Sequence, residues 1–195
     1  MERDIEFLFE MGSLRNMPRL WTRFLNSDFD NVAEHHFRVL WTSLVIAKHE
    51  KAGDPEKIMK MALVHDITES RNGDVDYISR QYVERKEELA IKDMLKDTSV
   101  EKEFLDVWRE YEKRQSIEAK IVKDADNIEI DFELREQAAK GSSLPVTLKE
   151  TRRLVGTTKL YTKSAKRIWR EVNKADPTDW FMKGRNRLNS GDWKK

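Results

Sequence analysis

The sequence predicts an all-α fold, in which residues 1–195 form a single compact bundle of helices. Charged residues make up 37% of the chain and only 7 Gly and 4 Pro interrupt it, a composition that favours helices with solvated faces over strands and turns. Apolar residues recur at helical spacing along most of the chain, whereas the alternation typical of half-buried strands is missing. Because no internal repeat or linker divides the chain, one domain is the most economical interpretation.

Composition also argues against several classes of protein. Cysteine is absent, so the chain forms neither a disulfide framework nor a thiolate zinc site, and we expect a reducing, cytoplasmic setting. The first residues, Met1–Asp4, carry mixed charge and lack the apolar core of a signal peptide. No apolar run approaches the roughly 20 residues that a membrane span needs, so we expect no membrane association. The net charge of +1 gives no general reason to expect nucleic acid as a partner.

The amino-terminal part is predicted to form a short helix followed by a loop. Apolar spacing favours a helix over Ile5–Met11, which Gly12-Ser13 ends. The stretch Asn16–Phe24 is too aromatic and too cationic for an idle linker, and Pro18 disfavours a regular helix there. Two interpretations stay open: the aromatic residues fill the core while the arginines remain in water, or the segment faces a ligand. The residues concerned are Arg19, Trp21, Arg23 and Phe24.

Two helices with clear start signals come next. Asn31 is the expected N-cap of a helix that runs through Lys48, and Glu34, three residues later, completes a capping box. Gly53 ends this segment, and Asp54-Pro55 opens the next helix with a cap followed by proline at the first helical position. The inward positions of the second helix are expected to be Ile58, Met61, Ala62, Val64 and His65.

The rest of the chain is predicted to be helical with two interruptions. A turn-rich loop spans Ser70–Ser79, and the segment Gly141–Pro145 breaks the pattern again. The expected helices cover about 81–96, 100–113, 116–139 and, as one long helix, 147–173. This last basic helix leads into a tail that contains tryptophan after Asp176-Pro177. From Lys159 onward 11 Lys or Arg oppose 4 Asp or Glu, which suits either a solvated face or contact with phosphates or a partner.

The pair His65-Asp66 is the first candidate for chemistry. It places an imidazole and a carboxylate at the end of an apolar run, where a buried, hydrogen-bonded pair is the plain alternative to a metal site. Adjacent residues on a helix diverge by about 100°, so a shared ion needs ligands from other helices. His35 can supply one, unless His35 and its neighbour His36 are surface or core residues.

Asp126 is the second carboxylate that such an ion would need. It lies within a segment whose apolar residues look buried, and a buried carboxylate must be paired, hydrogen-bonded or bound to metal. Asp124 is expected either to lie next to the ligands without binding the ion or to be solvated. Two His and two Asp form a mixed set that suits Mn, Fe, Co, Ni or Zn, and such an ion could hold a phosphate oxygen and activate water.

Two acidic residues near the pair could move protons. Glu69 follows Asp66 by three positions and emerges on the same helical face, and Asp74 comes from the loop beyond. Either could orient an attacking water or protonate a leaving oxygen. The alternatives are that Glu69 is a solvated helix residue and that Asp74 only forms a turn.

Taken in order and spacing, these pieces resemble the HD-domain metal-dependent phosphohydrolases, and within them the small single-domain branch that contains the 5'-deoxynucleotidases. The likeness covers about residues 16–139 and rests on four motifs. They are Glu34-His35, His65-Asp66 with Glu69, Gly73-Asp74, and the run from Lys123 through Asp124, Ala125, Asp126 and Asn127 to Ile128.

The resemblance implies a helical fold around one divalent ion and a homodimer that acts on nucleotides. It implies four metal ligands, an acid at the reacting water, an acid near the sugar or water, and an arginine and a tryptophan that approach the nucleotide. The implied metal ligands are His35, His65, Asp66 and Asp126. Glu69 is the acid at the reacting water, Asp74 is the acid near the sugar or water, and Arg19 and Trp21 approach the nucleotide. The residues implied to surround this site are Glu34, His36 and Lys123. A small residue usually follows the first histidine, so His36 either changes the surroundings of the ion or replaces His35 in part. Arg19 and Trp21 also stand closer together than in several relatives.

The leading prediction is therefore a cytoplasmic, divalent-metal-dependent phosphohydrolase that removes phosphate from (deoxy)ribonucleoside 5'-monophosphates. The alternative enzyme releases triphosphate or pyrophosphate from nucleoside triphosphates, which the basic tail would suit if it folded over the site. A non-enzymatic alternative is a scaffold or binding protein in which the ion is structural. Nucleic-acid binding through the tail ranks below these, and would use Lys163, Lys166, Arg167, Arg170 and Trp180.

Overall fold

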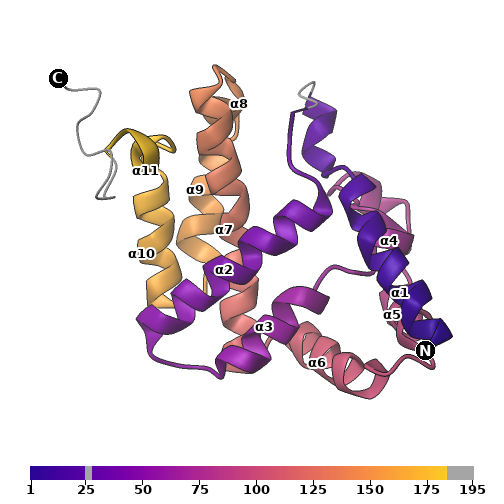
Figure 1. Ribbon diagram of the computed structural model, residues 1–195. Helices are drawn as coiled ribbons and strands as arrows, with labels where there is room; N and C mark the ends of the chain where they lie inside the picture. The colour runs from indigo at the N-terminus through magenta and orange to yellow at the C-terminus, as the bar shows by residue number, and fades with distance from the viewer. Residues whose placement is uncertain (25–27, 184–195) are drawn as a thin grey trace.

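The computed structural model describes residues 1–24 and 28–183, and within these ranges the chain is helical, with one isolated bridge between Pro18 and Asn31 and no strand. The all-α prediction is confirmed (Figure 1). None of the described helices is both long enough and apolar enough to cross a membrane. The α-helices are α1 (Glu2–Ser13), α2 (Val32–Glu50), α3 (Pro55–Val64), α4 (Glu69–Asn72), α5 (Glu87–Leu95), α6 (Glu101–Lys113), α7 (Ile117–Ala139), α8 (Leu144–Thr147), α9 (Lys149–Thr158), α10 (Lys163–Val172) and α11 (Asp179–Met182).

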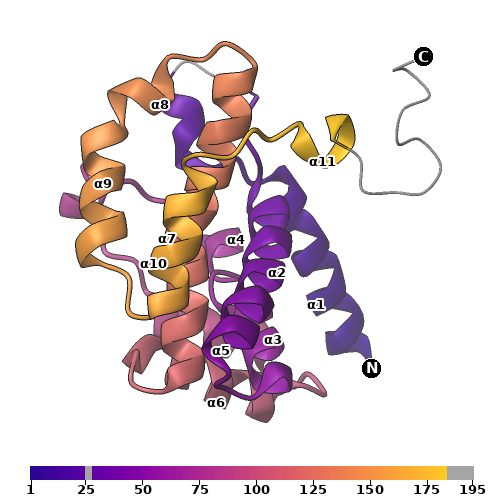
Figure 2. The same ribbon diagram turned by 90° about the vertical axis from the view of Figure 1, so that its left-hand side faces the viewer.

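The centre of the bundle is the packing of α2 and α3 against the long helix α7, with α10 completing this core (Figure 1). Its buried residues include Val39, Ile46, Met61, Ile121 and Ile128. A second apolar cluster lies where α1, α5 and α6 meet. In Figure 2, α1 lies beyond α2 on one side of the molecule and α9 lies on the other. The candidate site is formed where α2, α3 and α7 meet.

Three predicted helix starts are confirmed. Asn31 and Glu34 form the complete capping box of α2, Asp54 caps α3 with Pro55 in the first turn, and the Ser116 side chain caps α7. Each cap accepts a hydrogen bond from an otherwise unpaired backbone N–H of the first turn. The residue at which α2, α3 and α7 each begin is therefore fixed by its cap.

Two boundaries near the amino-terminal half differ from the prediction. The helix α1 continues through Gly12 to Ser13. The helix expected from residue 81 begins only at Glu87, because the Asp76 side chain accepts hydrogen bonds from the backbone N–H groups of Ile78 and Ser79. This turn leads into a short 3₁₀ helix at Ser79–Gln81 and leaves the chain irregular up to α5.

The prediction of one helix over residues 147–173 is wrong, because the chain turns between α9 and α10. Asp124 accepts hydrogen bonds from the backbone N–H of Tyr161 and Thr162, at 2.7 Å each, and from the Thr162 hydroxyl. The Thr162 side chain also caps α10. Fully buried Asp124 therefore anchors this turn to α7, and it neither is solvated nor belongs to the candidate metal cluster.

Candidate metal centre

Three helices bring the four predicted ligand residues to one point. His35 lies on α2, His65 and Asp66 directly follow α3, and Asp126 lies on α7. One nitrogen or oxygen atom from each side chain lies within 4.8 Å of the others. His35 Nε2 is 3.3 Å from His65 Nε2, 3.4 Å from Asp126 Oδ1 and 3.8 Å from Asp66 Oδ2. The fold thus joins residues that are up to 91 positions apart in the sequence.

The chemistry of this donor set fits a divalent transition metal. Two imidazole nitrogens and two carboxylate oxygens converge, which is a combination suited to Mn, Fe, Co, Ni or Zn rather than to Ca. His35 and His65 are buried, while Asp66 and Asp126 are partly exposed to the pocket. An ion held there by four protein ligands would therefore have its open positions on the pocket side, where water and substrate could bind.

The position of His35 follows from the start of α2. The Asn31 side chain accepts a hydrogen bond from the backbone N–H of Glu34 at 3.0 Å, and the Glu34 carboxylate accepts one from the backbone N–H of Asn31 at 3.3 Å. This reciprocal cap fixes the first turn, so that His35 in the next position points inward. Glu34, expected around the ion, instead belongs to the helix cap.

His65 and Asp66 can face the same point because α3 ends just before them. The chain from His65 to Thr68 forms a turn, which removes the divergence that a regular helix would impose on adjacent side chains. His65 Nδ1 lies 2.9 Å from the Ala62 carbonyl oxygen, and this contact leaves Nε2 directed at the other ligands. Burial lowers the pKa of His65, so the ring is kept in the neutral form that binds metal.

Asp126 is held by a lysine of its own helix. Lys123 Nζ lies 2.6 Å from Asp126 Oδ2, while the other carboxylate oxygen faces His35. Burial works against the charged form of Asp126, but Lys123 and His35 outweigh it and hold the pKa of Asp126 well below its usual range. Lys123 therefore contacts Asp126 directly and favours its ionised form.

His36 lies behind the cluster and does not face it. Its Nδ1 lies 2.7 Å from the carbonyl oxygen of Val32, and its ring centroid is 4.5 Å from that of His65. Burial, together with His65 and His35, lowers the pKa of His36 to about 3, so the ring is neutral. Its Nε2 has no hydrogen-bond partner among the described residues. The geometry gives His36 the role of packing against His65 and not that of a ligand.

Glu69, Arg19 and Asp74 form a buried polar group beside the four ligands. Arg19 Nε lies 3.8 Å from Asp74 Oδ2, which also accepts a hydrogen bond from the backbone N–H of Leu20 at 2.9 Å. Glu69 is buried, and its Oε2 has no hydrogen-bond partner within residues 1–24 and 28–183. Burial and the carboxylates of Asp66 and Asp74 raise the pKa of Glu69 to about 9. Glu69 is therefore not a solvated helix residue, and Arg19 does not remain in water.

These groups line a pocket of about 750 Å³. Trp21 forms part of its wall and packs against an apolar cluster that includes Ile130, Leu134 and Leu144. Its ring stacks on Phe24, with centroids 6.0 Å apart. A volume of this size falls within the usual range for sites that bind small molecules. Acidic side chains in the lining include Asp76, Glu87 and Glu112. The basic side chains in the lining, besides Arg19, are Arg23, Arg80, Arg85, Arg114, Lys123 and Arg152.

The basic carboxyl-terminal segment does not contribute residues to the lining of this pocket. The last residue in the pocket lining is Arg152, and α10 packs against α2 and α7 instead. Residues 184–195 of the predicted tail lie outside the described residues. Within residues 159–183, nothing reaches the pocket that would help to hold a longer phosphate chain.

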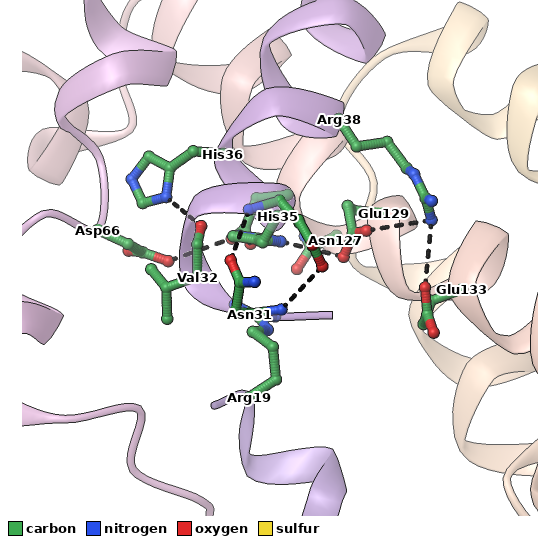
Figure 3. A network of polar contacts seen from close by, with 12 residues as sticks. Arg19, Asn31, Val32, His35, His36, Arg38, Asp66, Asn127, Glu129 and Glu133 are labelled. Atoms are coloured by element: carbon green, nitrogen blue, oxygen red, sulfur yellow. Dashed lines mark hydrogen bonds and ion pairs between the residues drawn. The ribbon is translucent and has the colours of Figure 1, made fainter. Parts of the chain in front are cut away.

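Sequence reasoning missed Glu129, Arg38 and Asp30. Glu129 is fully buried, and its Oε2 lies 3.0 Å from His35 Nδ1, on the side of the ring opposite the other ligands (Figure 3). Although burial is the largest contribution and opposes it, hydrogen bonds to Asp126 and Glu129 raise the pKa of His35 to about 9. An ion that binds Nε2 would therefore replace a proton there and leave the ring neutral. A signal was present in the sequence, since Glu129 follows Asp126 by one helical turn and therefore faces the same way.

Asp30 closes the polar network on the same side. Asp30, His35 and Glu129 also lie within 4.8 Å of one another, but His35 Nδ1 is already engaged by Glu129, and a neutral imidazole offers a lone pair on one nitrogen only. Neither Asp30 oxygen has a hydrogen-bond partner among the residues that the structure describes. Burial and Glu129 raise the pKa of Asp30 to about 7. This trio is therefore part of the surroundings of His35.

Comparison with known proteins gives close relatives for most of the chain. A 5'-deoxynucleotidase HDDC2 of Danio rerio is 32% identical over 142 residues, which is 70% of each chain. The protein of the same name from Dictyostelium discoideum is 34% identical over 142 residues, covering 67% of this chain and 75% of its own. Both names describe those proteins as enzymes that act on deoxynucleotides.

Solved structures agree with the fold. The PH0347 protein of Pyrococcus horikoshii OT3 matches with a TM-score of 0.72 and 26% identity, over 87% of this chain and 98% of its own. A predicted metal-dependent phosphohydrolase of Magnetospirillum magnetotacticum MS-1 matches with a TM-score of 0.66 and 21% identity, over 89% of this chain and 93% of its own, which shows the fold alone. The family model described as an HD domain matches residues 11–169, which include all four converging ligand residues, and the chain therefore belongs to the HD-domain family.

Proposed function

We propose that this protein is a divalent-metal-dependent phosphohydrolase that removes phosphate from (deoxy)ribonucleoside 5'-monophosphates. The observation that carries the proposal is the convergence of His35, His65, Asp66 and Asp126 at one pocket, beside buried Arg19 and Glu69. The relatives named 5'-deoxynucleotidase support the substrate class. The family model matches residues 11–169, a range that includes this whole site. One ion among Mn, Co, Fe, Ni and Zn is proposed as the cofactor.

The four ligands would hold the ion, which, when bound, supplies a Lewis acid for a phosphate oxygen and lowers the pKa of water. Arg19 offsets negative charge on the phosphate, because its guanidinium is buried beside the site and its Nε has no hydrogen-bond partner among the described residues. Glu69 orients the attacking water through its unpaired Oε2 and, because its raised pKa keeps it protonated, can donate a proton to the leaving oxygen. Asp74 holds Arg19 and the Leu20 backbone in place.

The substrate residues proposed beyond the ion are Arg19 and Trp21. Trp21 is a flat apolar wall of the pocket, which suits the sugar or base of a nucleotide. The pocket of about 750 Å³ can hold a nucleoside monophosphate with room to spare. The second candidate is hydrolysis of nucleoside triphosphates, because the arginines of the pocket lining would suit additional phosphate groups.

The test is product analysis over nucleoside mono-, di- and triphosphates with added Mn²⁺ or Co²⁺. We expect release of inorganic phosphate from deoxyribonucleoside 5'-monophosphates, dependent on metal and lost in His65→Ala and Asp126→Ala. His49→Ala is the matched control, since His49 contacts Arg167 on the surface and lies away from the cluster. Stoichiometric release of pyrophosphate or triphosphate would instead favour the second candidate, and turnover independent of metal would contradict both.

The proposal includes a homodimer in the cytoplasm, where nucleotide pools lie. Phe37, Trp41 and Val45 are exposed at successive turns of α2 and form an apolar stripe. A second copy could cover this stripe. Light scattering after size exclusion should give twice the mass of the chain for the wild type and the mass of one chain for Trp41→Glu. A wild-type monomer at micromolar concentration would contradict the dimer. Cell fractionation checks the compartment.

A further inference from the structure

The two histidines of the candidate metal centre are supported from behind in different ways. Each ring directs Nε2 at the other ligands, and each Nδ1 meets an oxygen atom. For His65 this atom is the backbone carbonyl oxygen of Ala62 at 2.9 Å. For His35 it is the carboxylate of Glu129 at 3.0 Å. A carboxylate at Nδ1 orients the ring. It also makes Nε2 a stronger electron-pair donor to a metal ion than a neutral carbonyl at Nδ1 does.

Both sides of His35 are set by the same helix. Asp126 and Glu129 lie one turn apart on α7, with Asp126 Oδ1 3.4 Å from Nε2 and Glu129 Oε2 3.0 Å from Nδ1. Because the two nitrogens of an imidazole lie on opposite sides of the ring, an Nδ1–H that donates to Glu129 leaves the Nε2 lone pair for an ion. The tautomer that binds metal is therefore the one that Glu129 selects.

The Glu129 carboxylate is itself held in place. Its side chain is fully buried, and its second oxygen, Oε1, lies 3.4 Å from Arg38 Nη1. The other guanidinium nitrogen of Arg38 donates to both oxygens of Glu136, at 3.1 and 2.9 Å (Figure 3 shows Arg38 beside Glu129). A buried carboxylate between an imidazole and a fixed guanidinium has little freedom to rotate.

We propose that Glu129, held by Arg38, is a positioning residue that fixes the tautomer and orientation of His35 for metal binding. This inference rests on the metal site of the proposed function. Glu129 does not touch the substrate or the reacting water. Its effect is on the affinity of the ion, and only through that on turnover.

The experiment measures the affinity of the purified chain for Co²⁺ alone, by competition with a chelating dye, together with the visible absorption spectrum of bound Co²⁺. We expect Glu129→Ala to weaken Co²⁺ binding by about 10- to 100-fold, as loss of the partner behind a ligating histidine does in other metal sites. Glu129→Gln keeps an acceptor oxygen and should recover part of this loss. The spectrum of Co²⁺ in Glu129→Ala should change, because the His35 ligand is no longer held at a fixed angle.

Glu133→Gln is the matched control. Glu133 lies one turn further along α7, is also buried, and also faces Arg38, at 3.6 Å, but it does not contact His35. We expect its Co²⁺ affinity and spectrum to equal those of the wild type. Thermal unfolding with a chelator present separates a positioning role of Glu129 from a purely structural one. If the role were purely structural, Glu129→Ala would lower the melting temperature without changing the affinity for Co²⁺.

Equal Co²⁺ affinity in the wild type and Glu129→Ala would overturn the inference, and so would equal losses in Glu129→Ala and Glu133→Gln. Should Glu129→Ala not fold, Glu129→Gln and Arg38→Met provide the same comparison with smaller expected losses. A wild type that hydrolyses nucleotides with Co²⁺ while Glu129→Ala binds the ion normally would remove only this inference. A wild type that binds no Co²⁺ would remove the proposed metal site as well.

Discussion

Single residues decide which charges the candidate site can carry. His36 directly follows the predicted ligand His35, and it is accommodated because its ring stays neutral and packs against His65. A charged imidazole there would repel the ion and both ligating histidines. His36 is therefore accommodated beside the four converging residues without joining them.

Glu69→Gln tests the residue proposed to act on the water. Gln has nearly the same shape but cannot transfer a proton, so we expect kcat to fall by about 10²- to 10⁴-fold, with Co²⁺ affinity unchanged because Glu69 is not among the four converging residues. Steady-state kinetics at saturating metal and a Co²⁺ titration check the two parts. Wild-type kcat in this variant would rule out proton transfer by Glu69.

Arg19→Lys tests the residue proposed to bind the phosphate. Lys keeps the positive charge among the surrounding carboxylates, so the chain should fold, but it cannot reproduce the planar guanidinium. We expect KM for a nucleoside monophosphate to rise by about 10- to 100-fold, since a hydrogen bond to a charged group contributes about 1.5–3 kcal/mol. Arg15→Lys, at an exposed position outside the pocket lining, should leave KM near the wild-type value. Equal KM values in the two variants would contradict the role of Arg19.

At the level of elements, the turn between α9 and α10 depends on contacts that are distant in sequence. Asp124 on α7 binds the backbone of this turn, and the two helices then approach each other closely at Gly156. A Cβ atom added at Gly156 would overlap the Trp169 ring. The turn and the close approach of α9 and α10 replace the single long helix that local propensity favoured, because tertiary packing outweighs propensity.

Gly156→Ala tests this close approach. The added methyl group would overlap the Trp169 ring and push α9 and α10 apart, so we expect the free energy of unfolding to fall by about 1–3 kcal/mol. Gly12→Ala is the control, because Gly12 lies within α1 and a Cβ there meets nothing within 4 Å. That variant should be stabilised by about 0.5–1 kcal/mol. Urea denaturation compares the two, and equal stability of Gly156→Ala and wild type would contradict the close packing.

At the level of the whole molecule, the buried apolar clusters of the bundle should hold the fold without an ion. Chelation should leave the helical circular dichroism signal intact and lower the melting temperature. At a free metal concentration of 100 times Kd, binding stabilises the native state by about 2.7 kcal/mol, which corresponds to roughly 5–11 °C for a chain of this size. Thermal scans with and without a chelator check this. Loss of helix on chelation would favour a structural ion over a catalytic one.

The sequence indicated much of the fold because its strongest signals are local. The caps at Asn31, Asp54 and Ser116 act on backbone groups within one turn, so neighbouring residues suffice to predict them. Where a distant side chain intervenes, as Asp124 does at Tyr161 and Thr162, propensity alone predicted the wrong helix. Boundaries of this kind depend on packing between elements that no local window contains.

The sequence by itself determined the chemical character of the site, because the residue types His35, His65-Asp66 and Asp126 limit which ions can bind. Only the tertiary structure decided that these residues converge and that Glu129, 94 positions from His35, supports its ring. It also decided that His36 packs against His65 and does not join the four converging residues. The physical reason is that donor types are properties of single residues, whereas distances between ligands arise only when α2, α3 and α7 bury their apolar faces against one another.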